Sequence, residues 1–436
     1  MGSLPNPEPF RVLIAGGSYG GLAVAVNLLD LTRGLPARSG PKPAEGDNEF
    51  QTPRPPQPQI PVDITIVDER DGFYHTIGTP LALASESFAE KCWIKYADIP
   101  ALQQAPNLRV LRGSLKAVDL EHKVATYVPN SNTTASSAEE EELLLHYDYF
   151  VAATGLRRAW PAVPQSLRRK QYLFEMGDHA RAMSVARNGV LVVGGGAVGI
   201  ETAAELKMVH PHLTVTLAHS RDTLLSSEPL PEELKQRTLE LLREAGVEVL
   251  MSHRLDRTED VKDDAGNLCT RVHFANGHTM VVDHVLMAIS RPVPSTRFLP
   301  PEVLDENGYV KIRSDLRFPV TTPNSSVHFA VGDLARWSGI KRCGGAMHMG
   351  YHAAHNIYQH MKAAAAAARG VEEEPEDIQL NEFPPVIGIA IGKKAVGYWK
   401  EAGVMAGEKE LKDFFGDDLG FTICWNHLGL GGDKTA

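Results

Sequence analysis

The sequence predicts an α/β fold in which one supersecondary unit occurs twice. RVLIAGGSYGGLAVAVNLL, from Arg11, leads from an apolar strand through a glycine-rich turn into a helix with apolar periodicity, and VLVVGGGAVGIETAAEL repeats this pattern from Val190. In such turns the first glycine permits the bend, the second lets backbone N–H groups approach a pyrophosphate, and the third lets helix pack on strand. Two copies predict two dinucleotides, and one protein that binds two of them most simply passes electrons between them.

Length, composition and charge limit the possible partners. The 436 residues exceed one ordinary core and indicate two or three domains, and 43% hydrophobic with 22% charged residues is ordinary for a globular protein. The net charge of −10 argues against a surface that tracks nucleic-acid phosphates and against strong attraction to anionic membranes. We expect small-molecule partners and no nucleic acid.

The sequence shows no targeting or membrane-spanning segment. No apolar run approaches the roughly 20 residues that span a bilayer, and MGSLPNPEPF lacks the apolar core of a signal peptide. Gly2 fits a myristoylation site poorly, because Asn6 stands where Ser or Thr is wanted. Four widely spaced cysteines without a CxxC pair indicate free thiols and no metal site. We expect a cytoplasmic protein, with peripheral membrane association left open.

The first unit continues into a second strand, VDITIVDER, after a long insertion rich in Pro, Gly and charge, TRGLPARSGPKPAEGDNEFQTPRPPQPQIP, which we expect to be solvated and mobile. A second insertion, PNSNTTASSAEEEELLL, interrupts a hairpin between HKVATYV and LHYDYFVAATG. LRRAWPAVPQSL is interpreted as a linker. The second unit starts at Gly189, its partner strand is LTVTLAHSR, and further strands are expected in GVEVLM and TRVHFANGHTMVVDHVLMAIS.

From VHFAVGD the chain is expected to return to the first domain, with a helix from about Gly345 that ends in an exposed linker, MKAAAAAARGVEEEPED. A hairpin, VIGIAIGKKAVGYW, and an amphipathic helix, EKELKDFF, follow. The predicted architecture is two Rossmann-like three-layer domains with a small α+β domain at the C-terminus. The first domain comprises residues 8–156 and 293–362, the second, residues 157–292, is inserted into it, and residues 363–436 form the third.

The first turn places Gly16, Ser18 and Gly21 at the three glycine positions. Serine at the middle position departs from the strict pattern but is the smallest substitute. Asp68 closes the next strand, where a carboxylate accepts hydrogen bonds from the ribose hydroxyls of an adenosine. The alternative is an ordinary strand-to-helix turn with a surface aspartate.

The second turn has the full glycine set, Gly194, Gly196 and Gly199. Its partner strand ends LAHSR, so His219 stands where an NAD-selective site offers a carboxylate. A carboxylate would repel a 2′-phosphate, whereas Ser220 and Arg221 can bind one by hydrogen bond and ion pair. This favours NADPH over NADH. The alternative is that Arg221 is a solvated loop charge and both nucleotides are used.

Three short strings resemble the two-dinucleotide flavoprotein superfamily. VAATG, with Thr154 and Gly155, resembles the strand end at which the chain leaves the flavin domain. VHFAVGD, with Gly332 and Asp333, resembles the second flavin motif, whose Asp contacts the ribityl chain, although an Asp at a helix entry is equally an ordinary N-cap. AISRPVP, around Arg291, resembles the motif that closes the nicotinamide domain.

Two absences narrow the subclass. Disulfide reductases carry a cysteine pair shortly after the flavin ribose carboxylate, and HTIGTPLALASESFAEKC offers only Cys92. LRRAWPAVPQSLRRKQYLFEMGDHARAM lacks the Phe, Gly, His signature of Baeyer–Villiger monooxygenases. Direct transfer from reduced flavin to an outside acceptor is the remaining hypothesis.

With these features the chain resembles the apoptosis-inducing-factor-like oxidoreductases, specifically the ferroptosis-suppressor branch, and more distantly the type II NADH dehydrogenases. GGSYGG, VDERDGFYH, VAATG, GGGAVGIETAAEL, LAHSR and AVGD follow the family's order between Arg11 and about His360. The resemblance implies bound FAD, oxidation of NADPH or NADH, and reduction of a quinone-like or other small acceptor. Ser18, the two insertions and the missing myristoylation pattern depart from it.

The resemblance also implies residue roles. His75 is expected near the flavin, as a proton donor to a reduced quinone or as a packed histidine, and Glu201 is expected to face the flavin or to be a helix-start carboxylate. The helix near Gly345 would direct its N-terminal amides at the flavin. The predicted cofactor-binding residues are Gly16, Gly17, Ser18, Tyr19, Gly20, Gly21, Asp68, Leu115, Thr154, Gly155, Gly194, Gly196, Gly199, Glu201, His219, Arg221, Arg291, Gly332 and Asp333.

Several alternatives stay open. Trp399 and Trp425 would frame an acceptor pocket, form a homodimer contact or pack in the core, and Cys343 is interpreted as a small packing residue. The same cofactors would serve a biosynthetic tailoring flavoprotein acting on a secondary-metabolite intermediate, or a redox signalling flavoprotein with slow turnover.

Overall fold

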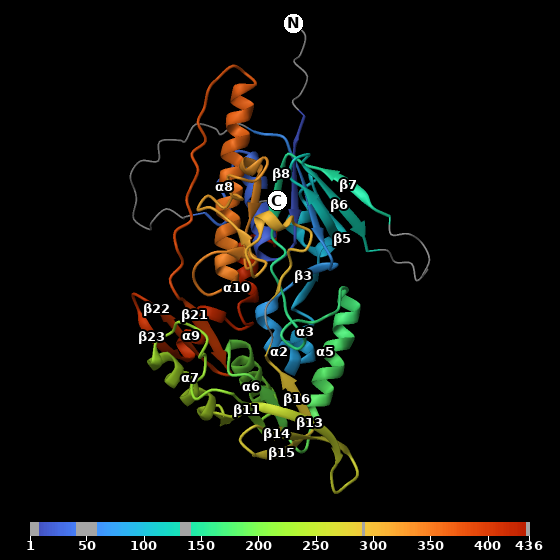
Figure 1. Cartoon of the computed structure of the whole chain (residues 1–436), viewed down its shortest axis with the longest axis vertical. Coiled ribbons are helices and arrows are strands. Elements are labelled where there is room, and N and C mark those ends of the chain that lie inside the picture. Colours follow the sequence, from blue (N-terminus) through green and yellow to red (C-terminus); the bar gives the residue numbers. More distant parts are fainter. Residues whose placement is uncertain (1–7, 41–58, 131–140, 290–292, 433–436) are drawn as a thin grey trace.

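The computed structural model describes residues 8–40, 59–130, 141–289 and 293–432. A mixed sheet with mainly parallel strands and a fully parallel sheet, each beside one glycine-rich turn, occupy the upper and lower halves of the molecule in Figure 1. Arg291, Gly2 and the central parts of both insertions lie outside the described residues. The predicted α/β class with Rossmann-like units is confirmed.

The upper sheet contains seven strands. In spatial order they are β19 (His328–Ala330), β8 (Tyr149–Ala152), β1 (Phe10–Ala15), β2 (Val62–Asp68), β5 (Leu108–Asp119), β6 (Val124–Pro129) and β7 (Leu143–His146). The first five pair in parallel, and β5, β6 and β7 pair antiparallel. The order shows that the chain returns to this sheet with β19, long after it has left with β8.

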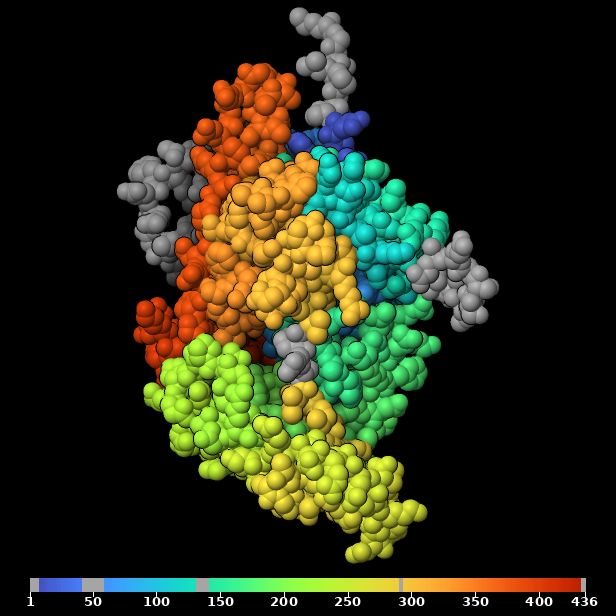
Figure 2. All heavy atoms as spheres, viewed as in Figure 1, coloured from blue at the N-terminus to red at the C-terminus, as the bar shows by residue number. Residues whose placement is uncertain are grey.

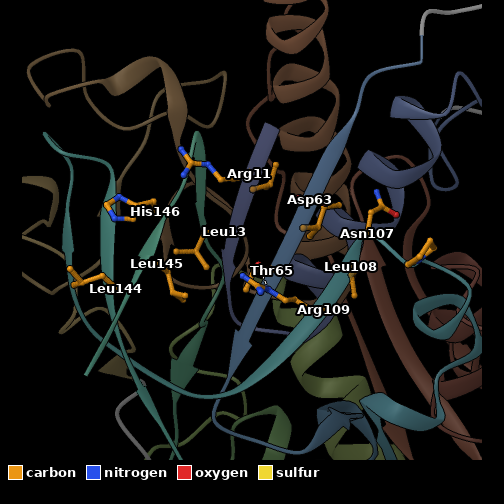
Figure 3. A pocket seen from close by; sticks show the side chains of 13 residues that line it. Arg11, Leu13, Asp63, Thr65, Asn107, Leu108, Arg109, Leu144, Leu145 and His146 are labelled. Carbon is orange, nitrogen blue, oxygen red and sulfur yellow. Dashed lines mark hydrogen bonds between the residues drawn. The ribbon is translucent and has the colours of Figure 1, made fainter. Parts of the chain in front are cut away.

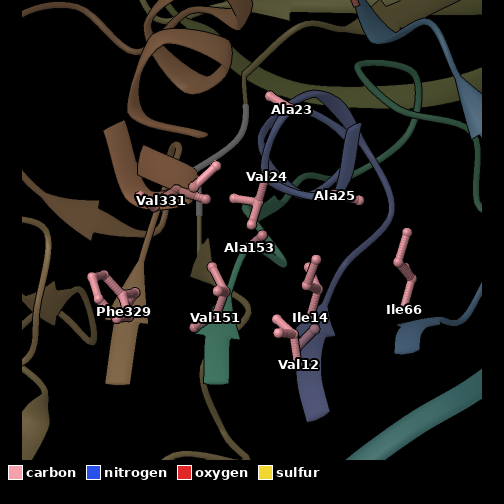
Figure 4. Close-up of a cluster of buried hydrophobic side chains, with 14 of the residues drawn as sticks. Val12, Ile14, Ala23, Val24, Ala25, Ile66, Val151, Ala153, Phe329 and Val331 are labelled. Carbon is pink, nitrogen blue, oxygen red and sulfur yellow. The ribbon is translucent and has the colours of Figure 1, made fainter. Parts of the chain in front are cut away.

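Helix α1 (Tyr19–Thr32) packs on this sheet. Figure 4 shows Val12 and Ile14 of β1 beneath it, beside strands β8 and β19. All of its residues except Leu31 are buried, because α8 (Cys343–Ala367) covers the side away from the sheet. The two helices meet so closely that a Cβ on Gly350 would lie 2.7 Å from the carbonyl oxygen of Gly20. Burying each large apolar side chain here contributes about 1.5–3 kcal/mol.

The lower sheet contains four parallel strands, β12 (Glu248–Leu250), β11 (Val215–Ala218), β10 (Val190–Val193) and β16 (His284–Met287). Helix α6 (Ala197–Val209) follows β10 through the second glycine-rich turn. A three-stranded antiparallel sheet lies next to the four-stranded sheet and forms the lower end of the molecule in Figure 2. Its strands are β13 (Leu255–Lys262), β14 (Leu268–Phe274) and β15 (Thr279–Val282).

Two short strands connect the halves. β9 (Leu156–Arg157) leaves the upper sheet, β17 (Val293–Pro294) returns to it, and the two pair antiparallel. Ser295 N–H donates to the Gly155 carbonyl at 3.0 Å, and Thr154 Oγ1 donates to the Ser295 carbonyl at 2.7 Å. The chain therefore crosses out and back at one place, as expected for an inserted unit.

The C-terminal segment contacts both halves. An antiparallel sheet of β21 (Ile387–Ile391), β22 (Lys394–Trp399) and β23 (Gly403–Gly407) is followed by α9 (Glu408–Phe415) and α10 (Phe421–His427). β21 packs on α6, and Lys394 pairs with Glu244, the last residue of helix α7 (Glu232–Glu244), at 2.9 Å. The Trp399 ring packs on Phe414 of α9, with 5.1 Å between centroids. Trp399 thus packs within the chain.

The remaining elements are short or were not predicted. The helices are α2 (Thr79–Ala84), α3 (Glu86–Ala89), α4 (Pro100–Gln103), α5 (Arg169–Ser184) and α7 (Glu232–Glu244), and the strands are β3 (Gly72–Tyr74), β4 (Trp93–Lys95), β18 (Val310–Lys311) and β20 (Ala335–Arg336). Single 3₁₀ turns lie at 76–78, 96–98, 301–303 and 325–327. In the described part of the chain, no helix is long and apolar enough to cross a membrane.

The predicted elements and the observed ones agree except at some ends. The predicted strands and hairpins match β2, β11, β12, the β6/β7 pair and the β21/β22 pair, and the amphipathic segment is α9. Helix α8 begins at Cys343 and continues to Ala367, past the predicted boundary at 362. The linker predicted to be exposed is held at its end, because Asp377 pairs with the buried Arg317 at 2.5 Å.

Both glycine-rich turns depend on one close contact. Gly16 and Gly194 take positive φ angles of +104° and +127°. A Cβ on Gly21 would lie 1.8 Å from the Gly16 carbonyl oxygen, and one on Gly199 would lie 1.9 Å from the Gly194 carbonyl oxygen. Only glycine permits this approach, so the third glycine sets where each helix begins relative to its strand.

We predict that Gly199→Ala lowers the free energy of unfolding by about 3 kcal/mol, because the methyl group overlaps a backbone carbonyl that cannot rotate away. Gly196→Ala in the same turn is the matched control, since a Cβ there would meet nothing within 4 Å and its φ of −85° suits any residue. Thermal unfolding without added nucleotide measures both. Equal midpoints for the two variants would contradict the packing argument.

Candidate functional site

The middle position of each turn has the same backbone conformation. Ser18 has φ −98° and ψ −157°, and Gly196 has φ −85° and ψ 175°. Both are extended conformations that any residue adopts, so Ser18 introduces no backbone strain. Neither helix has a side-chain cap at this residue or an acidic residue in its first turn. The first-turn amides of α1 and α6 therefore suit a pyrophosphate.

Asp68 organises the first turn. Its Oδ2 accepts from Gly17 N–H at 2.6 Å, and its Oδ1 accepts from Arg70 N–H at 2.8 Å. Burial raises the pKa of Asp68, and these amides oppose that shift. Tyr96 OH donates to the Gly17 carbonyl at 2.8 Å, and a Cβ on Gly17 would lie 2.4 Å from this hydroxyl. Sequence reasoning missed Tyr96, which lies in a 3₁₀ turn without a motif.

His219 occupies the same place beside the second turn. Gly195 N–H donates to His219 Nδ1 at 3.1 Å, as Gly17 donates to Asp68. Burial lowers the pKa of His219, so the ring is neutral and its Nε2–H donates to Ser226 Oγ at 3.1 Å. A neutral imidazole here replaces the carboxylate as the acceptor for the turn amide.

The loop after β11 carries the predicted phosphate ligands. Ser220 and Arg221 are exposed, and Arg221 Nη1 donates to Ser226 Oγ at 3.2 Å and contacts Ser227 Oγ at 3.5 Å. A guanidinium and hydroxyl groups thus lie together at the carboxyl end of β11. This group can bind a dianion by charge-assisted hydrogen bonds.

The residues predicted after β8 and β19 also lie together. Val331 N–H donates to the Ala152 carbonyl at 2.9 Å, which places the two strand ends side by side. Gly155 has φ +63° with no atom within 4 Å of a Cβ position, and Gly332 has φ +82°. Asp333 makes no hydrogen bond to a described side chain or amide, and burial raises its pKa while Lys341 lowers it. Its carboxylate is available to a hydroxyl ligand.

Leu115 lies on β5, close to the end of β2. The neighbouring Ser114 Oγ donates to Glu69 Oε1 at 3.2 Å, directly after Asp68. Leu115 itself is partly exposed and pairs with Tyr127 of β6. The structure therefore brings the predicted residues of the upper half together at the carboxyl ends of β1, β2, β8 and β19, where open α/β sheets bind ligands.

His75 is enclosed between Tyr19 and the C-terminal segment. Its Nε2 lies 2.9 Å from the Leu419 carbonyl, and because a carbonyl only accepts, Nε2 carries the proton. Nδ1 then accepts from Tyr19 OH at 3.0 Å. The side chain has no exposed surface, and burial lowers its pKa to about 4. The arrangement favours a positioning role, and the catalytic role of His75 stays a prediction.

Glu201 faces the C-terminal hairpin, beyond the first turn of α6. Its Oε1 accepts from Ala390 N–H of β21 at 3.3 Å. Glu205, one helical turn later, is buried beside it. Burial raises the pKa of both carboxyls to about 8, and the charge of Glu201 adds to the shift at Glu205. At neutral pH these two carboxyls, which lie between α6 and β21, therefore keep their protons.

A surface hollow of about 450 Å³ lies at the other end of the upper sheet. Figure 3 shows Arg11, Asp63 and Leu108 around it, and these residues lie at the amino ends of β1, β2 and β5. Ligands of open α/β sheets bind beyond the carboxyl ends of the strands. The hollow is therefore separate from the candidate cofactor site.

The Glu201/Glu205 pair predicts a pH dependence of stability. Between pH 4.5 and about 8 the folded protein holds protons that the unfolded chain has released, so its free energy of unfolding falls as pH rises through this window. Glu205→Gln should flatten the fall in Tm between pH 5 and pH 9. Glu233→Gln, at an exposed position on α7, should leave the curve unchanged. Parallel curves for wild type and Glu205→Gln would contradict the assignment.

Known proteins resemble this chain along most of its length. Oxidoreductase OXR1 of Ajellomyces capsulatus is 46% identical over 99% of this chain and 90% of its own. Ferroptosis suppressor protein 1 of Homo sapiens is 24% identical, over 77% of both chains.

Solved structures share the fold. An NAD-dependent persulfide reductase from A. fulgidus matches with a TM-score of 0.60 at 18% identity, over 89% of this chain and 63% of that one. A water-forming NADH oxidase from Lactobacillus brevis matches with a TM-score of 0.57 at 15% identity, over 89% and 74%.

A family model described as pyridine nucleotide-disulphide oxidoreductase matches residues 10–368. Members of this family bind FAD and use NAD(P)H, which agrees with two turns suited to pyrophosphates. The chain belongs to the pyridine nucleotide-disulphide oxidoreductase family, as an oxidoreductase with FAD as its cofactor and NAD(P)H as its co-substrate.

Proposed function

We propose that the protein takes electrons from NAD(P)H onto bound FAD and passes them directly to a quinone-like or other small-molecule acceptor, without a disulfide relay. The observation that carries this proposal is a difference between two turns with equivalent backbone contacts. The Gly17 amide of the first turn donates to the carboxylate of Asp68, whereas the Gly195 amide of the second donates to the imidazole of His219. An FAD would be held permanently at the first, and a nicotinamide nucleotide would exchange at the second.

Domain and residue assignments follow from this proposal. Residues 8–156 and 293–362 would form the FAD domain, residues 157–292 the NAD(P)H domain, and residues 363–436 a C-terminal acceptor domain. The FAD pyrophosphate would lie on the α1 amides and its ribityl chain near Asp333. Gly155 offers the open space that a close approach needs, since a Cβ there would meet nothing within 4 Å.

When bound, FAD supplies the chemistry of accepting two electrons from a nicotinamide and releasing them to an acceptor. The chain's own residues would orient the cofactor and enclose it. The N-terminus of α8, at Cys343, would direct its backbone amides at the cofactor and stabilise negative charge there. His75 fixes the Tyr19 hydroxyl and connects it to Leu419, and Glu201 holds a proton at neutral pH.

The surroundings of Cys92 support direct transfer. Cys92 is the thiol in the segment where disulfide reductases of this family carry their cysteine pair. It is buried, and burial raises its pKa to about 12. A thiol in this state is a poor nucleophile and exchanges slowly with disulfides.

The loop after β11 supports NADPH as the preferred donor. His219 satisfies the Gly195 amide without negative charge, so Arg221 and Ser220 are left to meet a 2′-phosphate. An engineered water-forming NADPH oxidase also matches this fold, with a TM-score of 0.58 at 15% identity. Nucleotide preference in this fold is therefore open to a few substitutions.

Anaerobic mixing tests the function. The purified protein should be yellow, NADPH should bleach it within one turnover time, and a quinone should restore the colour. A slowly formed, stable charge-transfer complex would overturn catalysis in favour of a signalling role. A folded, colourless protein that binds no flavin would overturn the proposal altogether.

Arg221→Ala tests the nucleotide preference. Losing a charge-assisted contact with the 2′-phosphate should raise KM for NADPH by about 10- to 100-fold and leave kinetics with NADH within about twofold. Arg257→Ala, an exposed arginine on β13, is the matched control. An equal rise in KM for NADPH and NADH in Arg221→Ala would show that Arg221 does not bind the 2′-phosphate.

A further inference from the structure

Two cysteines that are 81 positions apart in the sequence lie together beside Tyr19. Cys343 is the first residue of α8, Cys424 lies in α10, and their sulfur atoms are 4.0 Å apart. A disulfide needs about 2.05 Å between sulfurs, so the two sulfur atoms must approach each other by about 2 Å for the bond to form. Sequence reasoning did not find this pair, because nothing in either segment marks the other as its neighbour.

The two thiols differ in exposure and acidity. Cys343 is partly exposed at the N-terminus of a 25-residue helix, and Cys424 is buried. The hydrogen bond from Cys424, the Gly344 amide and the charge of Arg342 lower the pKa of Cys343, although burial opposes them. The pKa of Cys424 is raised, because it donates to Cys343 and is buried. A partly exposed thiol with a lowered pKa beside a buried thiol with a raised one suits an attacking and a resolving cysteine.

The contacts of α10 show what a bond between these cysteines would fix. Phe421, at the start of α10, packs its ring edge-on against His75 with 5.5 Å between centroids, and stacks on Trp425 at 5.5 Å. The Leu419 carbonyl just before α10 accepts the hydrogen bond from His75 Nε2–H. A covalent link from Cys424 to Cys343 would hold this helix against the Tyr19 and His75 side chains.

We propose that Cys343 and Cys424 are a modification site for low-molecular-weight disulfides, at which a reversible intramolecular disulfide ties α10 to the start of α8. Cys343 sulfur attacks the small disulfide, which forms a mixed disulfide and releases one thiolate that takes up a proton. Cys424 sulfur then attacks the Cys343 sulfur, the mixed bond breaks, and its proton passes to the second leaving thiolate. The chain loses two hydrogen atoms, and one small disulfide becomes two thiols. The electrons in this modification come from the two thiols and pass to the small disulfide, so the proposal does not rest on the identity of the acceptor used in turnover.

Thiol mapping of the flavin-containing protein tests the site. The protein is incubated with glutathione disulfide, quenched with N-ethylmaleimide in denaturant so that buried thiols also react, and digested for mass spectrometry. We expect a peptide pair joined through Cys343 and Cys424, alkylation at the other two cysteines, and reversal by dithiothreitol. A rise in Tm of about 5 °C should accompany oxidation, because the bond closes a long loop.

Matched variants make the result decisive. Cys343→Ser and Cys424→Ser should each abolish both the joined peptide and the Tm rise, whereas Cys269→Ser, buried in β14 of the other half, should retain both. Cys343→Ala and Cys424→Ala repeat the measurement in case serine disturbs folding. Stable glutathione on Cys343, disulfides between chains, or full alkylation of both cysteines in wild type would each overturn the proposal.

Discussion

In each glycine-rich turn the third glycine packs directly on the carbonyl of the first. This contact leaves no room for a side chain at Gly21 or Gly199, and it fixes each helix relative to its strand. Once α1 is fixed, its amides, the Gly17 bond to Asp68 and the packing of α8 over its outer side all follow. The same contact in the lower half sets α6, and with it the buried carboxyls that face the C-terminal hairpin.

The C-terminal segment gives the two halves a common boundary. Its hairpin packs on α6 and α7, and α10 packs on His75 in the upper half. Before the hairpin, an ion pair between Asp377 and the buried Arg317 holds the segment on the upper half. Groups that titrate or react, among them Glu201, His75 and Cys424, therefore lie where this segment meets the rest of the chain.

Sequence reasoning succeeded where the chemistry is local. Gly16, Asp68 and His219 lie at strand ends that periodicity identifies, and the structure places them beside the expected turns. It could not find Tyr96 beneath Gly17 or Cys424 beside Cys343, because those contacts arise from packing between segments with no shared motif. The same holds for His75. Its position near the first turn could be predicted from the sequence, but its hydrogen bond to the Leu419 carbonyl, from the other end of the chain, could not.

The paired connecting strands have a consequence for how such a protein is assembled. Because β9 and β17 are hydrogen-bonded neighbours, the start and the end of the inserted unit are almost the same point in space. A unit with adjacent ends can be gained, lost or exchanged between chains without moving the host strands, since β8 and β19 pair directly with each other. The inserted unit of such a protein can therefore change by recombination at a single junction, while the host half keeps its own core.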